Sequence, residues 1–244
     1  VPDPAAWWPA LNLAFTPLEG SSHPGRRLRF QAPPEARTPN PVLRTLAEAT
    51  KLRDSRATAS SLLDLLDLAP ISYRWQLPER DELARLIDAA EIRWGLDAQH
   101  RADQGLSGIA QNTWARGLDR LLAGLALAPG STALPISGVD VVSTSELELI
   151  GSLTEVFTRL RRYAATAGST TIPEWVARAR RLLDELIDLP PGEDSLLQEA
   201  TSRLAQLAEE GASSPVRVTA SDFTRLLEQL AAEPTSRMVM GNGN

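Results

Sequence analysis

The chain has 244 residues, 43% of them hydrophobic and 23% charged, which is typical of a folded globular protein and excludes a wholly disordered one. Its formal net charge of −6 argues against a protein that coats nucleic acid through bulk positive charge. There is no cysteine, so disulfides, thiolate-bound metals and cysteine nucleophiles are excluded. No apolar run is long enough to span a bilayer. We therefore expect a cytoplasmic protein without a membrane partner.

The first 38 residues combine a helical pattern with a basic, irregular stretch. Apolar residues at helical spacing predict a helix from Asp3 or Pro4 to about Phe15. Residues 21–40 are rich in proline, glycine and arginine, and the alternation at 26–30 predicts a short strand. Basic residues are concentrated in the first sixty positions: Arg26, Arg27, Arg29, Arg37, Arg44, Lys51, Arg53 and Arg56.

From residue 39 onward, apolar residues recur at spacings of three and four, which predicts a series of amphipathic helices. In chain order these are 42–49, 58–68, 81–90 and 112–127, then 145–165, 171–189 and 194–210 after a surface loop at 131–144. Thr58 or Ser60 is expected to cap the second of them. Residues 215–218 predict a short strand, and Thr219 or Ser221 should cap a closing helix through Leu230. The predicted fold class is mainly α, with at most one or two short strands.

The common catalytic patterns are absent from the sequence. A phosphate-binding loop needs glycines ahead of a lysine, and the only lysine, Lys51, lacks them. Acids such as Asp64 and Asp67 recur at helical spacing, which is typical of a solvated helix face. His23 lies in a turn-rich segment, and His100 fits a structural role at a helix end. We predict that this chain alone is no enzyme, with no catalytic residue, metal or cofactor.

Two tryptophan motifs stand out. The first is Ile92-Arg93-Trp94-Gly95-Leu96-Asp97-Ala98-Gln99-His100-Arg101, and the second runs from Gln111-Asn112-Thr113-Trp114-Ala115-Arg116-Gly117 to Gly124. In this order and at this distance they resemble the RecC family of exonuclease V gamma chains, of the actinobacterial type. The resemblance is strong over 39–126 and thins to a pattern of helices beyond about residue 130. Glu91 departs from it, because the family often has a glycine there.

The resemblance implies an excised helical domain like the 2B insertion of a superfamily 1 helicase, from the second helicase-like lobe of a subunit without ATPase function. It divides the chain into a first helix and basic segment (1–38), a motif-bearing helical subdomain (39–130) and a helical bundle that returns toward the lobe core (131–244). The implied partners are RecB-like and RecD-like subunits and, in the assembled complex, DNA as a duplex fork or single strand. The implied parent is a subunit of exodeoxyribonuclease V, an ATP-dependent helicase-nuclease of double-strand-break repair and recombination.

The motif residues have two possible roles, packing and DNA contact. Trp94 and Trp114 could stack on bases or fill a joint between helices, and we favour packing. The other structural candidates are Gly95, Asn112, Gly117 and Gly124, of which the glycines fit places where another backbone comes close. The candidates for phosphate contact are Arg26, Arg27, Arg29, Arg93, Arg101 and Arg116, each of which could instead pair with an acid or a partner subunit.

Two other functions stay open at this point. A helical interaction domain would use its acidic surface and amphipathic helices to bind only protein. An independent enzyme would show ATP hydrolysis or magnesium-dependent cleavage, and we predict neither for this chain. Binding of a forked duplex at low salt distinguishes the DNA-handling interpretation from the first of these.

Overall fold

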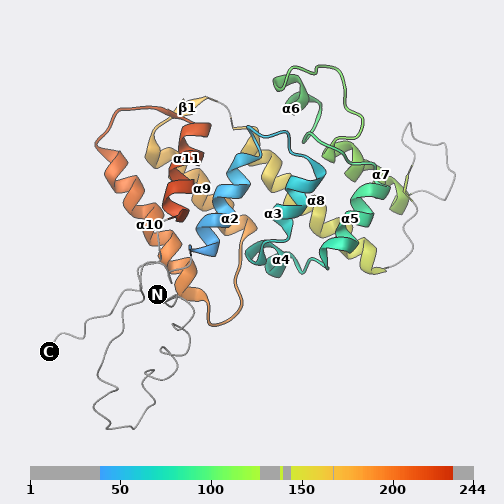
Figure 1. Cartoon of the computed structure of the whole chain (residues 1–244), viewed down its shortest axis with the longest axis horizontal. Coiled ribbons are helices and arrows are strands. Elements are labelled where there is room, and N and C mark those ends of the chain that lie inside the picture. Colours follow the sequence, from blue (N-terminus) through green and yellow to red (C-terminus); the bar gives the residue numbers. More distant parts are fainter. Residues whose placement is uncertain (1–38, 127–137, 140–143, 167, 233–244) are drawn as a thin grey trace, which may run out of the picture.

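A computed structural model describes residues 39–126, 138–139, 144–166 and 168–232 (Figure 1). Within them the chain is mainly helical, as the sequence predicts. The helices are α2 (Pro41–Lys51), α3 (Ala59–Leu66), α4 (Ala69–Trp75), α5 (Arg80–Ala89), α6 (Ala98–Asp103), α7 (Trp114–Ala126), α8 (Thr144–Ala164), α9 (Ile172–Leu186), α10 (Asp194–Ala212) and α11 (Ala220–Ala232). Two short strands, β1 (Ser169–Thr170) and β2 (Val218–Thr219), pair antiparallel.

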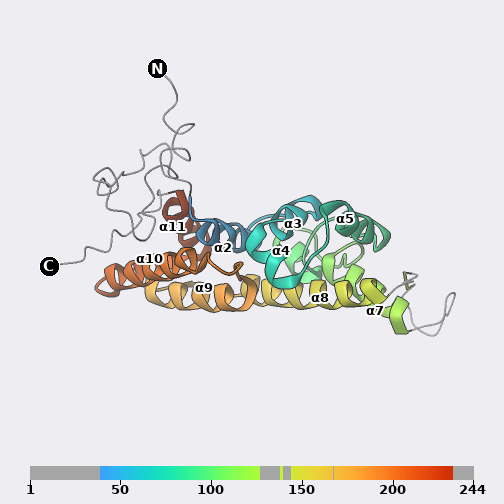
Figure 2. The ribbon, with the colours of Figure 1, turned by 90° about the horizontal axis from the view of Figure 1, so that it is seen from below.

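The helices form two layers. Helices α8 and α9 follow one another along one layer, with α10 beside α9 (Figure 2). Helix α2 packs against α11 in the other layer, where α3, α4 and α5 lie over α8. Buried apolar side chains of both layers form one continuous cluster, so a single core serves both. Across the described residues, no helix has the length and apolar character needed to cross a membrane.

Side-chain caps explain where two of the helices begin. The hydroxyl of Thr58 accepts a hydrogen bond from the backbone N–H of Ser61 at 3.1 Å, which confirms one of the two caps expected for α3. Thr219 and Asp222 cap α11 reciprocally. The Thr219 hydroxyl accepts from the N–H of Asp222 at 3.2 Å, and the Asp222 carboxylate accepts from the N–H of Thr219 at 3.2 Å.

Several predicted boundaries are wrong. The helix expected from 112 begins at Trp114, because Asn112 has a left-handed backbone with φ 59°. The helix expected at 171–189 ends at Leu186, where the extended Ile187 follows. The strand expected at 215–218 is β2, at Val218–Thr219. Helices α4 and α6 were missed, since seven and six residues give too few turns for a periodic pattern.

Some expected elements fall where the structure gives no description. The predicted first helix and the strand at 26–30 lie outside the described residues. The predicted loop at 131–144 also lies outside them, apart from Gly138, Val139 and the first residue of α8.

Candidate functional site

The two motifs meet a third segment and form one structure, which we call the motif joint: residues 56–59, 91–97 and 112–117. Main-chain hydrogen bonds connect its three parts. The N–H of Ala59 donates to the carbonyl of Arg93 at 2.8 Å, and the N–H of Gly95 donates to the carbonyl of Arg56 at 2.9 Å. From the other side, the N–H of Trp114 donates to the carbonyl of Gly95 at 3.0 Å. Residues far apart in the sequence are thereby fixed by backbone contacts.

Left-handed residues shape the turns of the motif joint. Glu91, Gly95 and Asn112 have φ values of 58°, 81° and 59°. Asparagine tolerates this conformation better than most residues, and the side-chain amide of Asn112 also donates to the carbonyl of Glu91 at 2.8 Å. A Cβ on Gly95 would lie 2.9 Å from Cγ of Arg101. Glycine at this position therefore serves both the turn and the close approach of an arginine.

Trp114 anchors the joint in the core. Its side chain is 1% exposed, and its indole N–H donates to the carbonyl of Ala57 at 3.1 Å. The ring stacks on Phe157 of α8 with 6.3 Å between ring centroids. One turn later on α7, a Cβ on Gly117 would lie 2.1 Å from Cγ1 of Ile92. Trp114 therefore packs between α7 and α8, and its ring offers no face to a base.

The second glycine of α7 also lies against a backbone. A Cβ on Gly124 would lie 1.7 Å from the carbonyl oxygen of Val139, so only a glycine leaves room for the chain that passes there.

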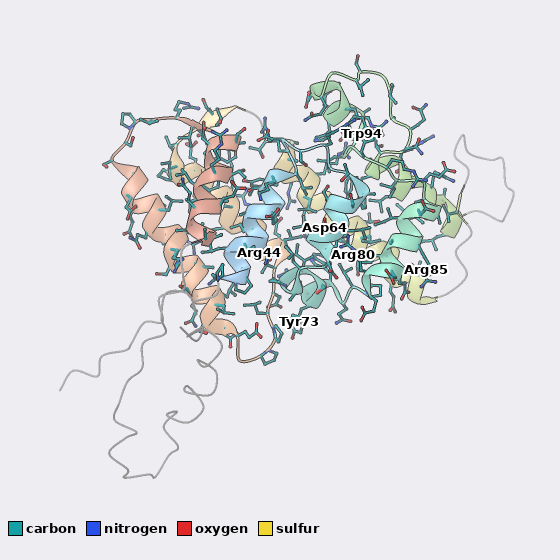
Figure 3. All side chains as sticks on the ribbon, viewed as in Figure 1. Arg44, Asp64, Tyr73, Arg80, Arg85 and Trp94 are labelled. Carbon is teal, nitrogen blue, oxygen red and sulfur yellow. The ribbon has the colours of Figure 1, made fainter. Side chains whose placement is uncertain are left out.

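Trp94 has a different environment. It is half-buried at the upper edge of the molecule near α6, away from Arg80 and Arg85 (Figure 3). The guanidinium carbons of Arg56 and Arg101 each lie 4.4 Å from the centroid of its ring. Cations at this distance from an indole are attracted by its electron-rich faces. Trp94 therefore already has two cationic partners within the protein.

The two arginines at Trp94 differ in exposure. Arg101 is 4% exposed and donates to the carbonyl of Trp94 at 2.9 Å, while its Nε has no hydrogen-bond partner in the described residues. Burial lowers the pKa of the Arg101 guanidinium, and the charge of Arg56 lowers it further. Arg56 is exposed. The site thus holds one buried and one accessible cation on a single aromatic ring.

Known proteins have sequences similar to that of this chain. A family model described as the RecBCD enzyme subunit RecC fourth domain matches residues 39–235, which include the whole motif joint. The chain belongs to the RecC family. It is 32% identical to the RecBCD enzyme subunit RecC of Mycobacterium tuberculosis strain H37Rv, over 96% of this chain and 22% of that protein. The actinobacterial resemblance is thereby confirmed.

Other RecC relatives cover less of the chain. The subunit of Mycolicibacterium smegmatis is 31% identical over 88% of this chain and 20% of its own length. The subunit of Escherichia coli K12 is 30% identical over 65% of this chain and 14% of its own length. The chain therefore spans about a fifth of the length of its mycobacterial relatives.

Of the arginines predicted to contact phosphate, the structure places only Arg101 at Trp94. Arg93 is exposed and pairs with Asp88 at 2.7 Å, and Arg116 lies 3.9 Å from Asp119. The candidates Arg26, Arg27 and Arg29 lie outside the described residues. Arg56 was not a candidate for DNA contact, because the sequence marked it only as one of several basic residues among the first sixty.

The acidic residues and histidine considered above have structural surroundings. Asp64 is exposed and pairs with Arg80 at 2.6 Å. His100 is 8% exposed within α6, and its backbone N–H donates to the capping carboxylate of Asp97 at 2.8 Å. In the part of the RecC-family chain that the structure describes, no three acids or histidines lie close enough to hold a metal ion.

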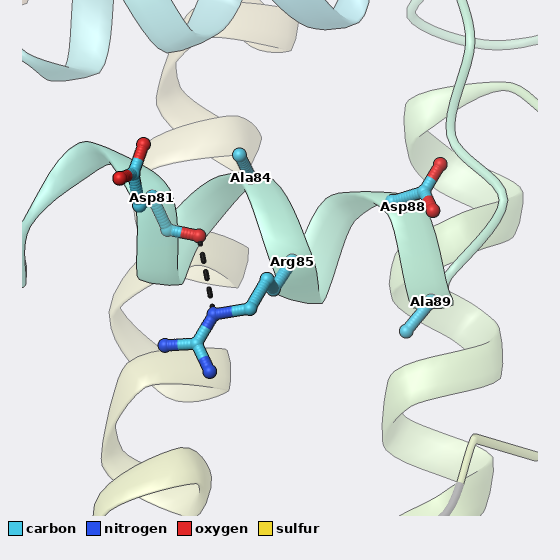
Figure 4. A pocket seen from close by; sticks show the side chains of 5 residues that line it. All are labelled: Asp81, Ala84, Arg85, Asp88 and Ala89. Carbon is cyan, nitrogen blue, oxygen red and sulfur yellow. Dashed lines mark hydrogen bonds between the residues drawn. The ribbon is translucent and has the colours of Figure 1, made fainter.

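An open hollow lies on α5. It is lined by Asp81, Ala84, Arg85, Asp88 and Ala89, all from one helix (Figure 4). Nε of Arg85 donates to the carbonyl of Asp81 at 3.4 Å. Because all five lining residues come from α5, no second element faces them across the hollow. The hollow therefore lacks the convergent polar groups of a small-molecule site.

Proposed function

We propose that this chain is a non-catalytic part of the RecC-like subunit of a cytoplasmic RecBCD-type helicase-nuclease, and that it contributes to DNA handling and to contacts with RecB-like and RecD-like subunits. The observation that carries the proposal is the family match over residues 39–235. The parent acts in double-strand-break repair and recombination. The division of labour in such a complex leaves this piece to position DNA and partners while other parts perform the chemistry.

The surface chemistry supports both kinds of contact. Arg56 and Arg93 expose guanidinium groups near the first motif, and guanidinium forks suit phosphate oxygens. The segment after α6 exposes two apolar side chains, Leu106 at 42% and Ile109 at 43%. Apolar side chains on a projecting segment favour a protein contact.

The experiment is a pair of measurements on the 244-residue chain. A forked duplex should be retarded in a native gel at low salt, and the retardation should weaken as salt rises, because phosphate contacts release counterions. The full-length parent carrying Leu106→Ser and Ile109→Ser should assemble less well with its RecB-like and RecD-like partners in size-exclusion chromatography. Normal assembly together with no DNA retardation at tens of micromolar chain would contradict the proposal.

A second candidate function, a protein-interaction domain without direct DNA contact, is favoured by the net charge of −6 and by the same two apolar side chains. It predicts that assembly falls with the double serine variant while the chain never retards DNA. The two measurements therefore separate the candidates.

A further inference from the structure

Residues 104–111, which we call the uncharged loop, lie between α6 and α7 at the outer edge of the molecule (Figure 1). All of them are exposed, and none is charged, although 23% of the whole chain is. The loop holds two large apolar side chains in solvent, Leu106 at 42% and Ile109 at 43% exposed. An uncharged surface with exposed apolar side chains suits contact with protein.

Arg101 of α6 connects the uncharged loop to the first tryptophan motif. Its side chain is 4% exposed, and its two terminal nitrogens donate to the carbonyls of Trp94 at 2.9 Å and of Ile109 at 3.4 Å. The backbone carbonyl of Arg101 accepts from the N–H of Leu106 at 2.8 Å. Both exposed apolar residues of the loop are therefore attached through their backbone to one buried arginine.

These attachments order the uncharged loop before any partner is present. The loop contains Gly105 and Gly108, and glycines give a free segment high conformational entropy. Burial of an arginine costs free energy, which its hydrogen bonds to carbonyls partly offset. A loop that is already held in one conformation loses less entropy on binding, so a partner that fits it binds more tightly.

We propose that Arg101 is a positioning residue for a protein contact: it holds the uncharged loop so that Leu106 and Ile109 are presented to an apolar, uncharged surface of a partner subunit. The inference rests on the proposed function, and it adds the buried residue on which that contact depends. The loop has no cation to offer a phosphate, which argues against nucleic acid as its occupant. A charged protein group buried against the loop would find no counter-charge within it.

The test is a double-mutant cycle in the full-length parent, assembled with its RecB-like and RecD-like partners. The variants are Arg101→Gln, the serine pair Leu106→Ser with Ile109→Ser, and all three substitutions together. Mass photometry over a range of subunit concentrations measures the concentration at which half of the parent is assembled. Thermal melting of the parent monitors folding. Where Arg101→Gln lowers the melting temperature, Arg101→Lys, which keeps the charge but has a single terminal nitrogen, takes its place in the cycle.

The matched control is Arg159→Gln on α8, which removes an arginine with similar contacts far from the uncharged loop in sequence. A terminal nitrogen of Arg159 donates to the carbonyl of Glu155 at 2.9 Å, and its guanidinium carbon lies 4.9 Å from the centroid of the Trp75 ring. The control therefore changes the net charge equally and removes both a carbonyl contact and a cation from a tryptophan ring.

Arg101→Gln should raise the half-assembly concentration by about fivefold or more, while Arg159→Gln leaves it unchanged. Adding Arg101→Gln to the serine pair should cause no further loss, because an arginine that acts through the loop has no effect once the apolar side chains are gone.

Three results would overturn the proposal. The first is a full further loss in the triple variant, since Arg101 would then act independently of the uncharged loop. The second is normal assembly of Arg101→Gln, and the third is an equal loss in Arg159→Gln. If the serine pair still lowers assembly in these cases, only the role of Arg101 fails and the proposed function stands. Normal assembly of the serine pair would overturn the positioning role together with the partner contact on which it rests.

Discussion

The motif joint and the C-terminal bundle, which comprises α9, α10 and α11, each contain a buried tryptophan with the same kinds of contact. Trp114 in the joint is 1% exposed and stacks on Phe157, and Trp175 in the bundle is 0% exposed and stacks on Phe223. Each indole N–H donates to a backbone carbonyl of a distant segment, at 3.1 and 3.0 Å. The anchors are alike, so the difference between the regions lies in what surrounds them.

The joint is built from backbone, and the bundle from side-chain packing. In the joint, turns at Glu91, Gly95 and Asn112 have positive φ, and main-chain hydrogen bonds fix three segments together. In the bundle, helix faces bury mainly leucine, with valine and alanine, and aliphatic residues can replace one another at small cost when volume is conserved. A backbone constraint admits few residue types, so it leaves a recognisable motif. This explains why the motifs that suggest the RecC family from the sequence alone lie at residues 92–124, although the family model matches residues 39–235.

The largest effects should come from the two anchors themselves. Trp114→Ala and Trp175→Ala should each lower the free energy of unfolding by about 3–5 kcal/mol, because each leaves a large cavity in the core. The phenylalanine variants keep most of the burial but leave a carbonyl unpaired, so we expect about 1–3 kcal/mol. Urea unfolding followed by circular dichroism measures all four. A loss below about 1 kcal/mol for either alanine variant would show that the region does not depend on its tryptophan.

The next largest effects should come from two glycines, Gly117 in the motif joint and Gly211 in the C-terminal bundle. Gly117→Ala should destabilise by about 1–3 kcal/mol, because the new Cβ would lie 2.1 Å from Cγ1 of Ile92, which is 0% exposed and has no room to move. Gly211→Ala meets Cβ of Ile172 at 2.7 Å, a longer contact, but this Cβ can move only with the backbone of α9, so this variant should also destabilise, though by less than Gly117→Ala. The gain in helix propensity, about 1 kcal/mol, offsets part of the contact in both variants. Equal losses in urea unfolding would mean that the joint is no more rigid than the bundle.

Much of the fold was predictable from the sequence, because helical periodicity and capping are local. The cap at Thr58 follows from residues within one turn. The site was predictable only in part. Trp94 and Arg101 share one motif, whereas Arg56 reaches the same ring from a loop that only the tertiary fold brings there. Spacing along the chain carries no information about such a contact.

The α6 segment tests how far the joint depends on charge. Burial would raise the pKa of Asp97, but hydrogen bonds from the His100 N–H and from Arg161 outweigh it, so the pKa is lowered from 3.8. A lowered pKa contributes stability that is present at neutral pH and is lost as the pH falls below 3.8 through the folded-state value. Asp97→Ala should therefore cost about 1 kcal/mol at pH 7, with a smaller difference from wild type in acid.

The control for Asp97→Ala is Asp103→Ala, at the exposed opposite end of the same helix. It should change stability by less than about 0.5 kcal/mol at pH 7. Chemical denaturation of wild type and both variants between pH 7 and pH 3 measures the difference. A constant loss for Asp97→Ala across this range would contradict a role for the ionised carboxylate.

The smallest expected effect concerns Glu91, a residue of the motif joint that has a positive φ but is not a glycine. At Gly192, between α9 and α10 of the bundle, a positive φ is met by glycine, whereas in the joint Glu91 adopts φ 58° with a side chain. A left-handed residue with a Cβ costs about 1–2 kcal/mol, and the exposed ion pair of Glu91 with Arg120, at 2.8 Å, returns at most about 1 kcal/mol. Glu91→Gly should therefore raise the melting temperature slightly. Asn112→Gly should lower it, because the Asn112 amide donates to the carbonyl of Glu91 at 2.8 Å. If Glu91→Gly instead lowers the melting temperature as much as Asn112→Gly does, the ion pair outweighs the backbone strain. The motif joint would then depend on side-chain contacts as the bundle does.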